Sequence, residues 1–294
     1  MKKVVSLLIS FILVFLILGL VGNGILRSTV LNKDYVLTKM DETEYYRSMS
    51  EEINSGFEEY IYQSGLPVDI IDGIYTDEQV RADVNSFVDY IYNDRDDFVV
   101  SGAAVKTTLD DKINNYLTEE NIKLNEVGKE NINTFEELIV NEYNVKVQIS
   151  TTIYEGFRNI FAKINSIENM ILGNIGLIIA TVICVIVIGV VNRDYIVKVI
   201  NYVGISTLSA GIILKAVLYL VAKTIDFDNI LVYSVALTNL VSFIAKKILV
   251  SISTISTGMI VGGAIAIIVY AVFSPQNGEG KVKAKPIRRR RKTA

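Results

Sequence analysis

The chain has 294 residues, of which 51% are hydrophobic, and it contains no histidine, no tryptophan and a single cysteine, Cys184. These counts exclude a disulfide within the chain, and they exclude the catalytic triads and zinc sites that depend on histidine. The formal net charge is −3, but residues 24–168 carry 28 acidic and 13 basic side chains, whereas the other residues carry 4 acidic and 16 basic. Such asymmetry predicts that the two parts face different compartments.

The first predicted element is an apolar run, Val4–Val21, that follows two lysines. A helix needs roughly 20 residues to cross a membrane, so this run predicts an N-terminal transmembrane anchor over residues 1–24. Basic residues accumulate on the cytoplasmic side, which places the N-terminus inside. A cleaved signal peptide is the alternative. It is disfavoured because the run exceeds a usual signal core and "LVGNG" is a poor cleavage site.

Residues 25–168 are predicted to form an acidic, extracytoplasmic helical domain. Apolar side chains recur there at helical spacing, which is typical of helices that pack around one core. The clearest stripes are Tyr45, Met49, Ile53, Phe57 and Ile61, then Val80, Val84, Phe87, Val88 and Ile91, then Leu109 and Ile113. Thr76–Gln79 and Thr134–Glu137 each have the pattern of a helix-starting capping box. A groove for a peptide or partner is the alternative use of these apolar faces.

One stretch of this domain, "SGLPVDIIDGIYTDEQVRADVNSFVDYIY" (Ser64–Tyr92), resembles a recurring element of uncharacterised bacterial membrane proteins. Those proteins combine an N-terminal span, an outer helical domain and a hydrophobic C-terminal half. The resemblance implies the same architecture in a bacterial cell envelope. It brings no activity and no functional residues.

The C-terminal half, residues 169–273, predicts three further spans, at about 171–191, 199–222 and 248–273. Between the last two, residues 228–247 have a polar face and an apolar run too short to span. They predict an amphipathic helix on the outer membrane surface. A fifth span is the alternative, but it would place the basic tail outside, against the charge rule.

The tail, residues 274–294, has eight basic residues among its last fourteen, including Arg288, Arg289, Arg290 and Arg291. We interpret it as a cytoplasmic topology anchor. Nucleic-acid binding is the alternative, and it is disfavoured because no aromatic side chains alternate with the basic ones. No nucleic-acid partner is predicted.

Small residues repeat every four positions in three of the predicted spans. The residues are Thr254, Gly258, Gly262 and Ala266 in the last span, Gly176, Ala180 and Cys184 in the second, and Thr207 and Gly211 in the third. Such stripes let helix backbones approach closely in lipid, within one chain or between copies. Ordinary use of glycine in membrane helices is the alternative.

Few residues are candidates for chemistry. Lys215 is the only full charge well inside a predicted span, so it is either a polar membrane site or a side chain that reaches the outer surface. Asp94, Asp96 and Asp97 are clustered, but the glycine and glutamate of a calcium-binding loop are missing at the required spacing. No catalytic, metal or cofactor residue is predicted.

The sequence therefore predicts an all-α integral membrane protein, with an extracytoplasmic helical domain on a four-helix transmembrane bundle. We expect a multi-pass cell-membrane protein with both termini in the cytoplasm. The expected function is non-enzymatic, in interaction, sensing or assembly, with the lipid bilayer and an envelope protein or a second copy as partners. A channel or transporter, or a subunit of one, is the alternative.

Overall fold

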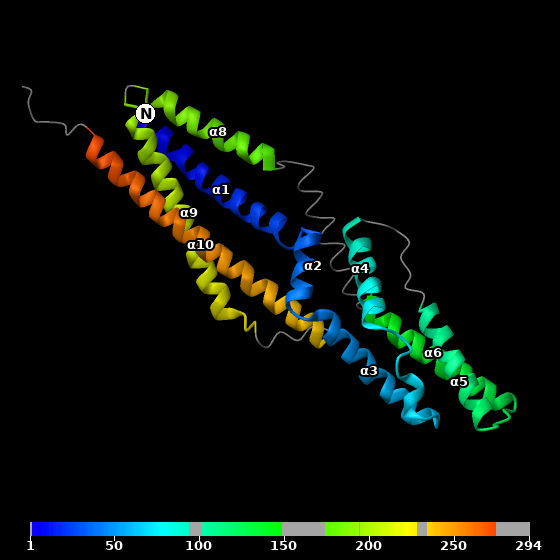
Figure 1. Cartoon of the computed structure of the whole chain (residues 1–294). Coiled ribbons are helices and arrows are strands. Elements are labelled where there is room, and N and C mark those ends of the chain that lie inside the picture. Colours follow the sequence, from blue (N-terminus) through cyan, green and yellow to red (C-terminus); the bar gives the residue numbers. More distant parts are fainter. Residues whose placement is uncertain (1, 94–101, 149–173, 194, 228–233, 275–294) are drawn as a thin grey trace, which may run out of the picture.

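The computed structural model describes residues 2–93, 102–148, 174–193, 195–227 and 234–274, and every regular element in them is helical. The predicted all-α fold is confirmed. Polar helices α2–α6 gather at one end of the molecule, and apolar helices α1, α8, α9 and α10 extend away from them (Figure 1). Asp94, Asp96, Asp97 and the anchor Arg288–Arg291 lie outside the described residues.

The α2–α6 domain has one hydrophobic core. Its elements are α2 (Lys33–Glu42), α3 (Tyr45–Ser64), the short helix η1 (Val68–Ile71), α4 (Asp77–Asn93), α5 (Ala103–Glu119) and α6 (Glu126–Gln148). Every residue of the stripe predicted on α3 is buried, and α3 packs on α4 and α6. The predicted face of α4 is buried too, apart from Ile91. Regular spacing of apolar residues thus identified the core-facing sides.

The two predicted capping boxes have different outcomes. Thr76 does precede α4, and its hydroxyl accepts a hydrogen bond from the Gln79 backbone N–H at 3.1 Å. The box at Thr134 is wrong, because Thr134 lies inside α6 and donates to the Glu130 carbonyl at 2.9 Å. A threonine in a helix satisfies its hydroxyl in this way, so the motif alone does not mark a start.

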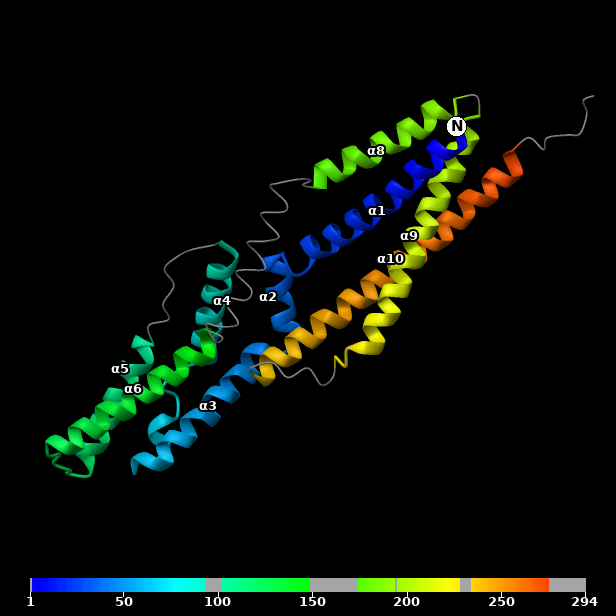
Figure 2. The ribbon, with the colours of Figure 1, turned by 180° about the vertical axis from the view of Figure 1, so that it is seen from behind.

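The apolar helices are α1 (Lys2–Ser28), α8 (Asn174–Val191), α9 (Val197–Thr224) and α10 (Val235–Phe273). Among the described residues, α1, α9 and α10 are long and apolar enough to cross a membrane, and α8 is a shorter apolar helix. These helices support the predicted membrane location. The end of the molecule remote from the α2–α6 domain contains the starts of α1 and α9 and the ends of α8 and α10 (Figures 1 and 2).

Helix α10 corrects the predicted division of residues 228–273. The structure has one uninterrupted helix of 39 residues, not a surface helix followed by a separate span. At 1.5 Å per residue it is about 58 Å long, roughly twice the hydrocarbon thickness of a membrane. About half of it therefore extends beyond any membrane that it crosses.

The first turns of α10 belong to the core of the α2–α6 domain. Ala236, Leu237 and Leu240 are buried in the same cluster as the apolar side chains of α2 and α3. The helix start is capped twice: Leu237 N–H donates to the Ser234 hydroxyl at 3.0 Å, and Ala236 N–H donates to the Glu52 carboxylate of α3 at 2.8 Å. The apolar face expected on a membrane surface is packed against protein instead.

Buried polar side chains link α1 to its neighbours. The Asn192 side-chain amide, just after α8, donates to the Ser6 hydroxyl at 2.8 Å. The Ser206 hydroxyl of α9 donates to the Ser10 carbonyl at 2.9 Å. Hydrogen bonds of this kind stabilise helix contacts where the surroundings are apolar. They fix α1 against the end of α8 and the middle of α9.

Candidate functional site

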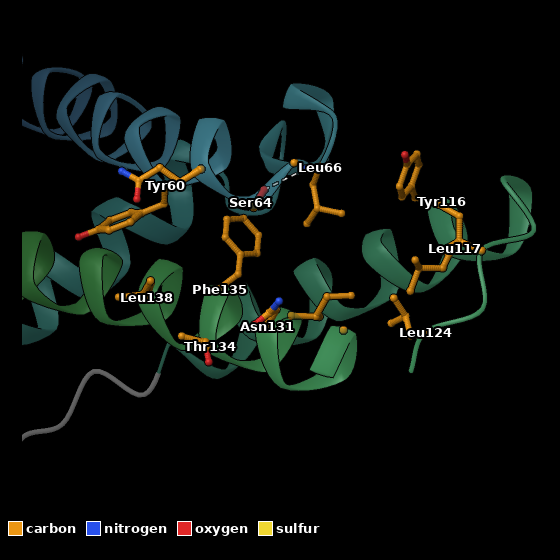
Figure 3. Close-up of a pocket in the computed structure, with 15 residues that line it drawn as sticks. Tyr60, Ser64, Leu66, Tyr116, Leu117, Leu124, Asn131, Thr134, Phe135 and Leu138 are labelled. Carbon is orange, nitrogen blue, oxygen red and sulfur yellow. Dashed lines mark hydrogen bonds between the residues drawn. The ribbon is translucent and has the colours of Figure 1, made fainter. Parts of the chain in front are cut away.

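A pocket lies between the ends of α3 and α5 and one side of α6, in the α2–α6 domain. Its volume is 530 Å³. Figure 3 shows Phe135 pointing from α6 toward the end of α3, near Ser64, with Tyr60 of α3 on one side and Tyr116 of α5 on the other. We call this the α3–α6 pocket.

Nine of the fifteen residues that line the α3–α6 pocket are apolar or aromatic, and polar atoms form much of the remaining surface. None of its described lining residues is charged, and the polar ones are neutral amides and hydroxyls, such as Asn131 and Thr134. Ile122 and Leu138 line it while remaining 42% and 40% exposed. A pocket of a few hundred Å³ with apolar walls and a few neutral polar groups is typical of ligand sites. Its chemistry suits an uncharged, apolar group.

Two residues with a left-handed backbone conformation follow the helices that border this pocket. Gly65 follows α3 with φ +75°, a conformation that glycine adopts without strain. Asn121 follows α5 with φ +56°. At the first of these ends, the Ser64 hydroxyl accepts from the Leu66 N–H at 3.0 Å, which holds the turn close to the helix. The pocket thus lies where two helices stop and α6 continues.

A carboxyl pair joins α5 and α6 next to the pocket. Glu136, which follows Phe135 in the chain, is only 6% exposed and lies next to the Asp110 carboxyl of α5. Burial raises the pKa of Glu136 to about 7, the Asp110 carboxyl adds to the rise, and Lys106 of α5 opposes it. Below about pH 7 the Glu136 carboxyl is therefore mostly protonated.

We expect the Glu136–Asp110 pair to make stability depend on pH. Folding raises the pKa of Glu136 from 4.5 to about 7, so the folded state binds the extra proton between these values and the free energy of unfolding falls as pH rises through them. Above about pH 7 the free energy of unfolding has lost the full contribution of this proton, about 3 kcal/mol. Glu136→Gln should therefore melt higher than the wild type at alkaline pH, measured by circular dichroism.

The matched control for that experiment is Glu137→Gln, because Glu137 is the next residue and is exposed. Its melting temperature should follow the wild type across the pH range. If the melting temperatures of Glu136→Gln and the wild type differ by the same amount in acid and in alkali, the pKa of Glu136 is not raised in the folded state.

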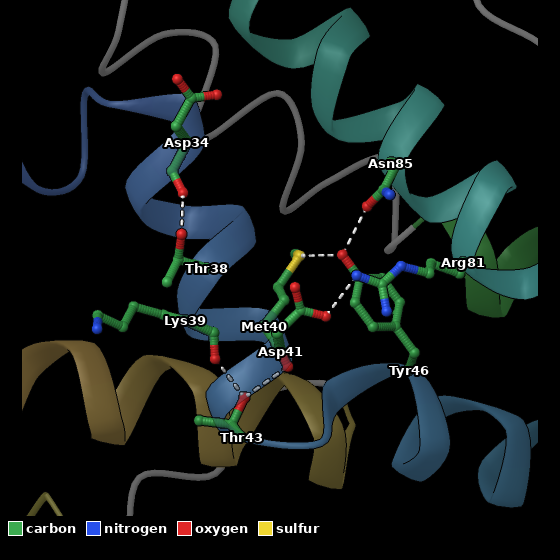
Figure 4. Close-up of polar contacts among 9 residues, drawn as sticks. All are labelled: Asp34, Thr38, Lys39, Met40, Asp41, Thr43, Tyr46, Arg81 and Asn85. Atoms are coloured by element: carbon green, nitrogen blue, oxygen red, sulfur yellow. Dashed lines mark hydrogen bonds and ion pairs between the residues drawn. The ribbon is translucent and has the colours of Figure 1, made fainter.

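A second polar cluster fixes α2 to α3 and α4 (Figure 4). Arg81 of α4 forms an ion pair with Asp41 of α2 at 2.7 Å and lies over the Tyr46 ring, 4.8 Å from its centroid. The Tyr46 hydroxyl donates to Asn85 Oδ1 at 2.6 Å. These partners satisfy one another, so the cluster is structural.

The Lys215 side chain extends from α9 toward α10. Its ammonium donates to the hydroxyls of Ser253 and Thr257 on α10, at 2.7 and 3.0 Å. Both acceptors are neutral, and the printed contacts of Lys215 include no carboxylate among the described residues. The contact cross-links α9 to α10 at the point where the predicted polar membrane site was placed.

The predicted small-residue stripe is on the wrong side of α10 for a contact within the chain. Thr254, Gly258 and Gly262 are exposed, and a Cβ atom added at either glycine would meet no described atom within 4 Å. The contact with α9 uses the neighbouring face, where Ser256 and Gly263 are buried. A contact between copies through the exposed stripe stays a prediction.

Glycines of α9 complete this close contact. A Cβ atom at Gly204 would lie 2.8 Å from the Cβ of Ala266, the only member of the predicted stripe near α9, and one at Gly211 would lie 2.9 Å from Ile260. On α8, Gly176 and Ala180 are half-buried, and α8 packs chiefly on α1. Sequence reasoning found the residue type that permits close packing but selected the wrong face of α10.

Among the described residues, no group of three or more acidic or cysteine side chains is placed to hold a metal ion. The chain matches no family model, no curated protein and no solved structure in the three comparisons made with known proteins. The resemblance of Ser64–Tyr92 stays an expectation, and the function has to be inferred from the residues and their geometry.

Proposed function

We propose that the protein is a non-enzymatic membrane protein of the bacterial cell envelope that binds a partner through its α2–α6 domain. The observation that carries the proposal is the α3–α6 pocket, 530 Å³ in volume and lined by described residues without charge. Its surroundings are acidic in sequence, so an uncharged apolar lining marks a specific place on the domain. The proposed occupant is an apolar segment of a protein partner.

The proposed orientation has the α2–α6 domain outside and both chain termini in the cytoplasm. It is supported by the basic residues at both termini and the acidic balance of residues 24–168. Under this orientation α1, α8, α9 and α10 form a four-helix transmembrane bundle. The even number of passes agrees with the helix ends that lie together at the end remote from the domain.

The structure of α10 supports a role in sensing or assembly, because one helix is part of both regions. Its start lies in the core with α2 and α3, and its later turns pack on α9. A change in the domain that moves α3 therefore also moves the start of α10, through the Glu52 cap and the buried Leu237 and Leu240. Occupancy of the pocket would reach the bundle by this route.

A subunit of a channel or transporter is the second candidate. The observation that favours it is Lys215, a charge held between α9 and α10 by Ser253 and Thr257. Loss of ion or solute flux in a Lys215→Met variant that keeps its melting temperature would favour this candidate over partner binding.

One labelling experiment tests both the orientation and the pocket. Leu138→Cys places a thiol in the pocket, and Val127→Cys places one on an exposed part of α6, 63% exposed, outside the pocket lining. Both are made with Cys184→Ala, which removes the native thiol. On intact cells a membrane-impermeant maleimide should label Val127→Cys rapidly and Leu138→Cys slowly, because the bound partner protects the pocket.

After purification and removal of the partner, the two thiols should react at comparable rates. If neither thiol is labelled until the cells are lysed, the α2–α6 domain faces the cytoplasm and the proposed orientation is wrong. Equal rates on intact cells would show that the pocket is unoccupied, and the proposed function would then lose its support.

A further inference from the structure

A second described pocket lies at the end of the molecule remote from the α2–α6 domain. It has a volume of 130 Å³ and is formed by the starts of α1 and α9 together with the ends of α8 and α10. Its lining includes three lysines and three tyrosines: Lys2, Lys3, Lys198, Tyr195, Tyr202 and Tyr270. We call it the lysine pocket.

The charge of the lysine pocket is strongly positive. No acidic residue is among its described lining residues, and Lys3 and Lys198 form no ion pair within the part of the chain that is described. The Lys198 ammonium lies over the Tyr195 ring, 5.2 Å from its centroid. Arg193 and Asp194 follow α8 in the chain and have opposite charges, and Asp194 lies outside the described residues.

Neutral hydrogen-bond donors accompany the cations. The hydroxyls of Tyr195, Tyr202 and Tyr270 and the amide of Asn201 line the pocket and make no hydrogen bond with another described side chain or backbone group. The pocket also adjoins the N-terminal ends of α1 and α9, where helix dipoles favour negative charge. Cations, hydroxyls and two helix starts all favour the same ligand, an anion with several acceptor oxygens.

Size and position select the kind of anion. The cavity has the volume of about four water molecules, which is enough for one phosphate group, and the rest of a larger ligand would lie outside it. It lies where three helices able to cross a membrane have their ends, the depth at which lipid headgroups and tyrosines are found. Basic pockets between membrane helices bind anionic headgroups at this depth.

We propose that the lysine pocket binds a phosphate group, supplied by the headgroup of an anionic phospholipid. The phosphodiester oxygens accept from Lys3, Lys198 and the tyrosine hydroxyls, while the acyl chains lie along the apolar surfaces of α1 and α9. This lipid fixes the ends of all four apolar helices relative to one another. The site is separate from the α3–α6 pocket and does not depend on what binds there.

The test uses the full chain in nonionic detergent, with phosphatidylglycerol or phosphatidylcholine added and bound lipid counted by native mass spectrometry. The wild type should retain phosphatidylglycerol in preference to phosphatidylcholine. The double variant Lys3→Gln, Lys198→Gln should lower that affinity about 25-fold, because each basic residue near an anionic lipid contributes about a factor of five. The control is Lys223→Gln with Lys247→Gln, which removes the same charge from exposed positions on α9 and α10 outside the lysine pocket.

Equal retention of phosphatidylglycerol by the two double variants would overturn the proposal, and so would equal retention of the two lipids by the wild type. A second arm separates the sources of phosphate. Inorganic phosphate is titrated while the melting temperature is followed. If it stabilises the wild type and not Lys3→Gln, Lys198→Gln, and no lipid is retained, the pocket binds a free phosphate ion and the lipid source is wrong.

Discussion

Replacing Gly263 by alanine should destabilise the protein, whereas the same replacement at the adjacent Gly262 should not. A Cβ atom at Gly263 would lie 2.6 Å from the Leu208 backbone nitrogen and 2.8 Å from the Gly204 carbonyl oxygen. Backbone atoms cannot move aside as a flexible side chain does, so α9 and α10 must separate. Overpacking of this kind costs about 1–3 kcal/mol, and we expect the upper part of that range.

Gly262→Ala is the matched control, because nothing lies within 4 Å of a Cβ atom there. Alanine in a helix is favoured over glycine by up to about 1 kcal/mol, so this variant should melt at or above the wild-type temperature. Circular dichroism of the purified protein measures both. Equal changes in melting temperature at the two positions would contradict the contact between α9 and α10. In a separate experiment, loss of an oligomer in Gly262→Leu would assign the exposed stripe to contacts between copies.

Leu240→Ala should loosen the α2–α6 domain even though Leu240 lies in the longest apolar helix. The side chain is 3% exposed and packs in the cluster that α2 and α3 share with α10. Truncating a buried leucine typically costs about 2–5 kcal/mol, part of it from the cavity that remains. Hydrogen exchange followed by mass spectrometry should show faster exchange in α3 and in the first turns of α10.

The contact of α9 with Ser256 and Gly263 should keep its protection in Leu240→Ala, because those residues lie more than four turns further along α10. Val235→Ala is the control at the same helix end, since Val235 is 65% exposed. If exchange in α3 were unchanged by Leu240→Ala, the start of α10 would not be part of that core.

The core faces of the polar helices could be predicted from the sequence, because a face in contact with water is polar and a face in contact with the core is apolar. On α3 the residues between the members of the stripe from Tyr45 to Ile61 are mostly polar and face solvent, apart from the buried Tyr46 and Ser50. The period of the apolar side chains therefore identifies one face. The start of α4 was also predictable from Thr76, whose hydroxyl accepts a helix N–H.

The same reasoning fails for α10, because lipid and protein interior are both apolar. Gly262 and Gly263 are adjacent in sequence and chemically identical, and only the position of α9 makes one buried and the other exposed. The continuity of α10 was missed for a related reason. A short amphipathic run such as residues 235–247 fits a membrane surface and a protein surface equally well, and its partner Glu52 is 184 residues away.

The α3–α6 pocket was only partly predictable. The tyrosines and apolar stripes of α3 and α5 indicated apolar faces with a capacity to bind, but the pocket exists because α3 ends at Gly65 and α5 ends near Asn121. The exact ends of helices depend on local turns and on packing across the domain. No single stretch of sequence contains that information.

The place of α10 in the α2–α6 core also sets an order of biogenesis. A ribosome completes α2 and α3 long before it reaches Leu237 and Leu240, so the nascent domain has to wait with part of its core uncovered. Until α9 and α10 have been synthesised and inserted, Glu52 has no helix start to cap. Maturation of the first domain is therefore tied to translation of the last helix. A chain that stops before residue 234 has a domain whose hydrophobic surface is open to chaperones and proteases.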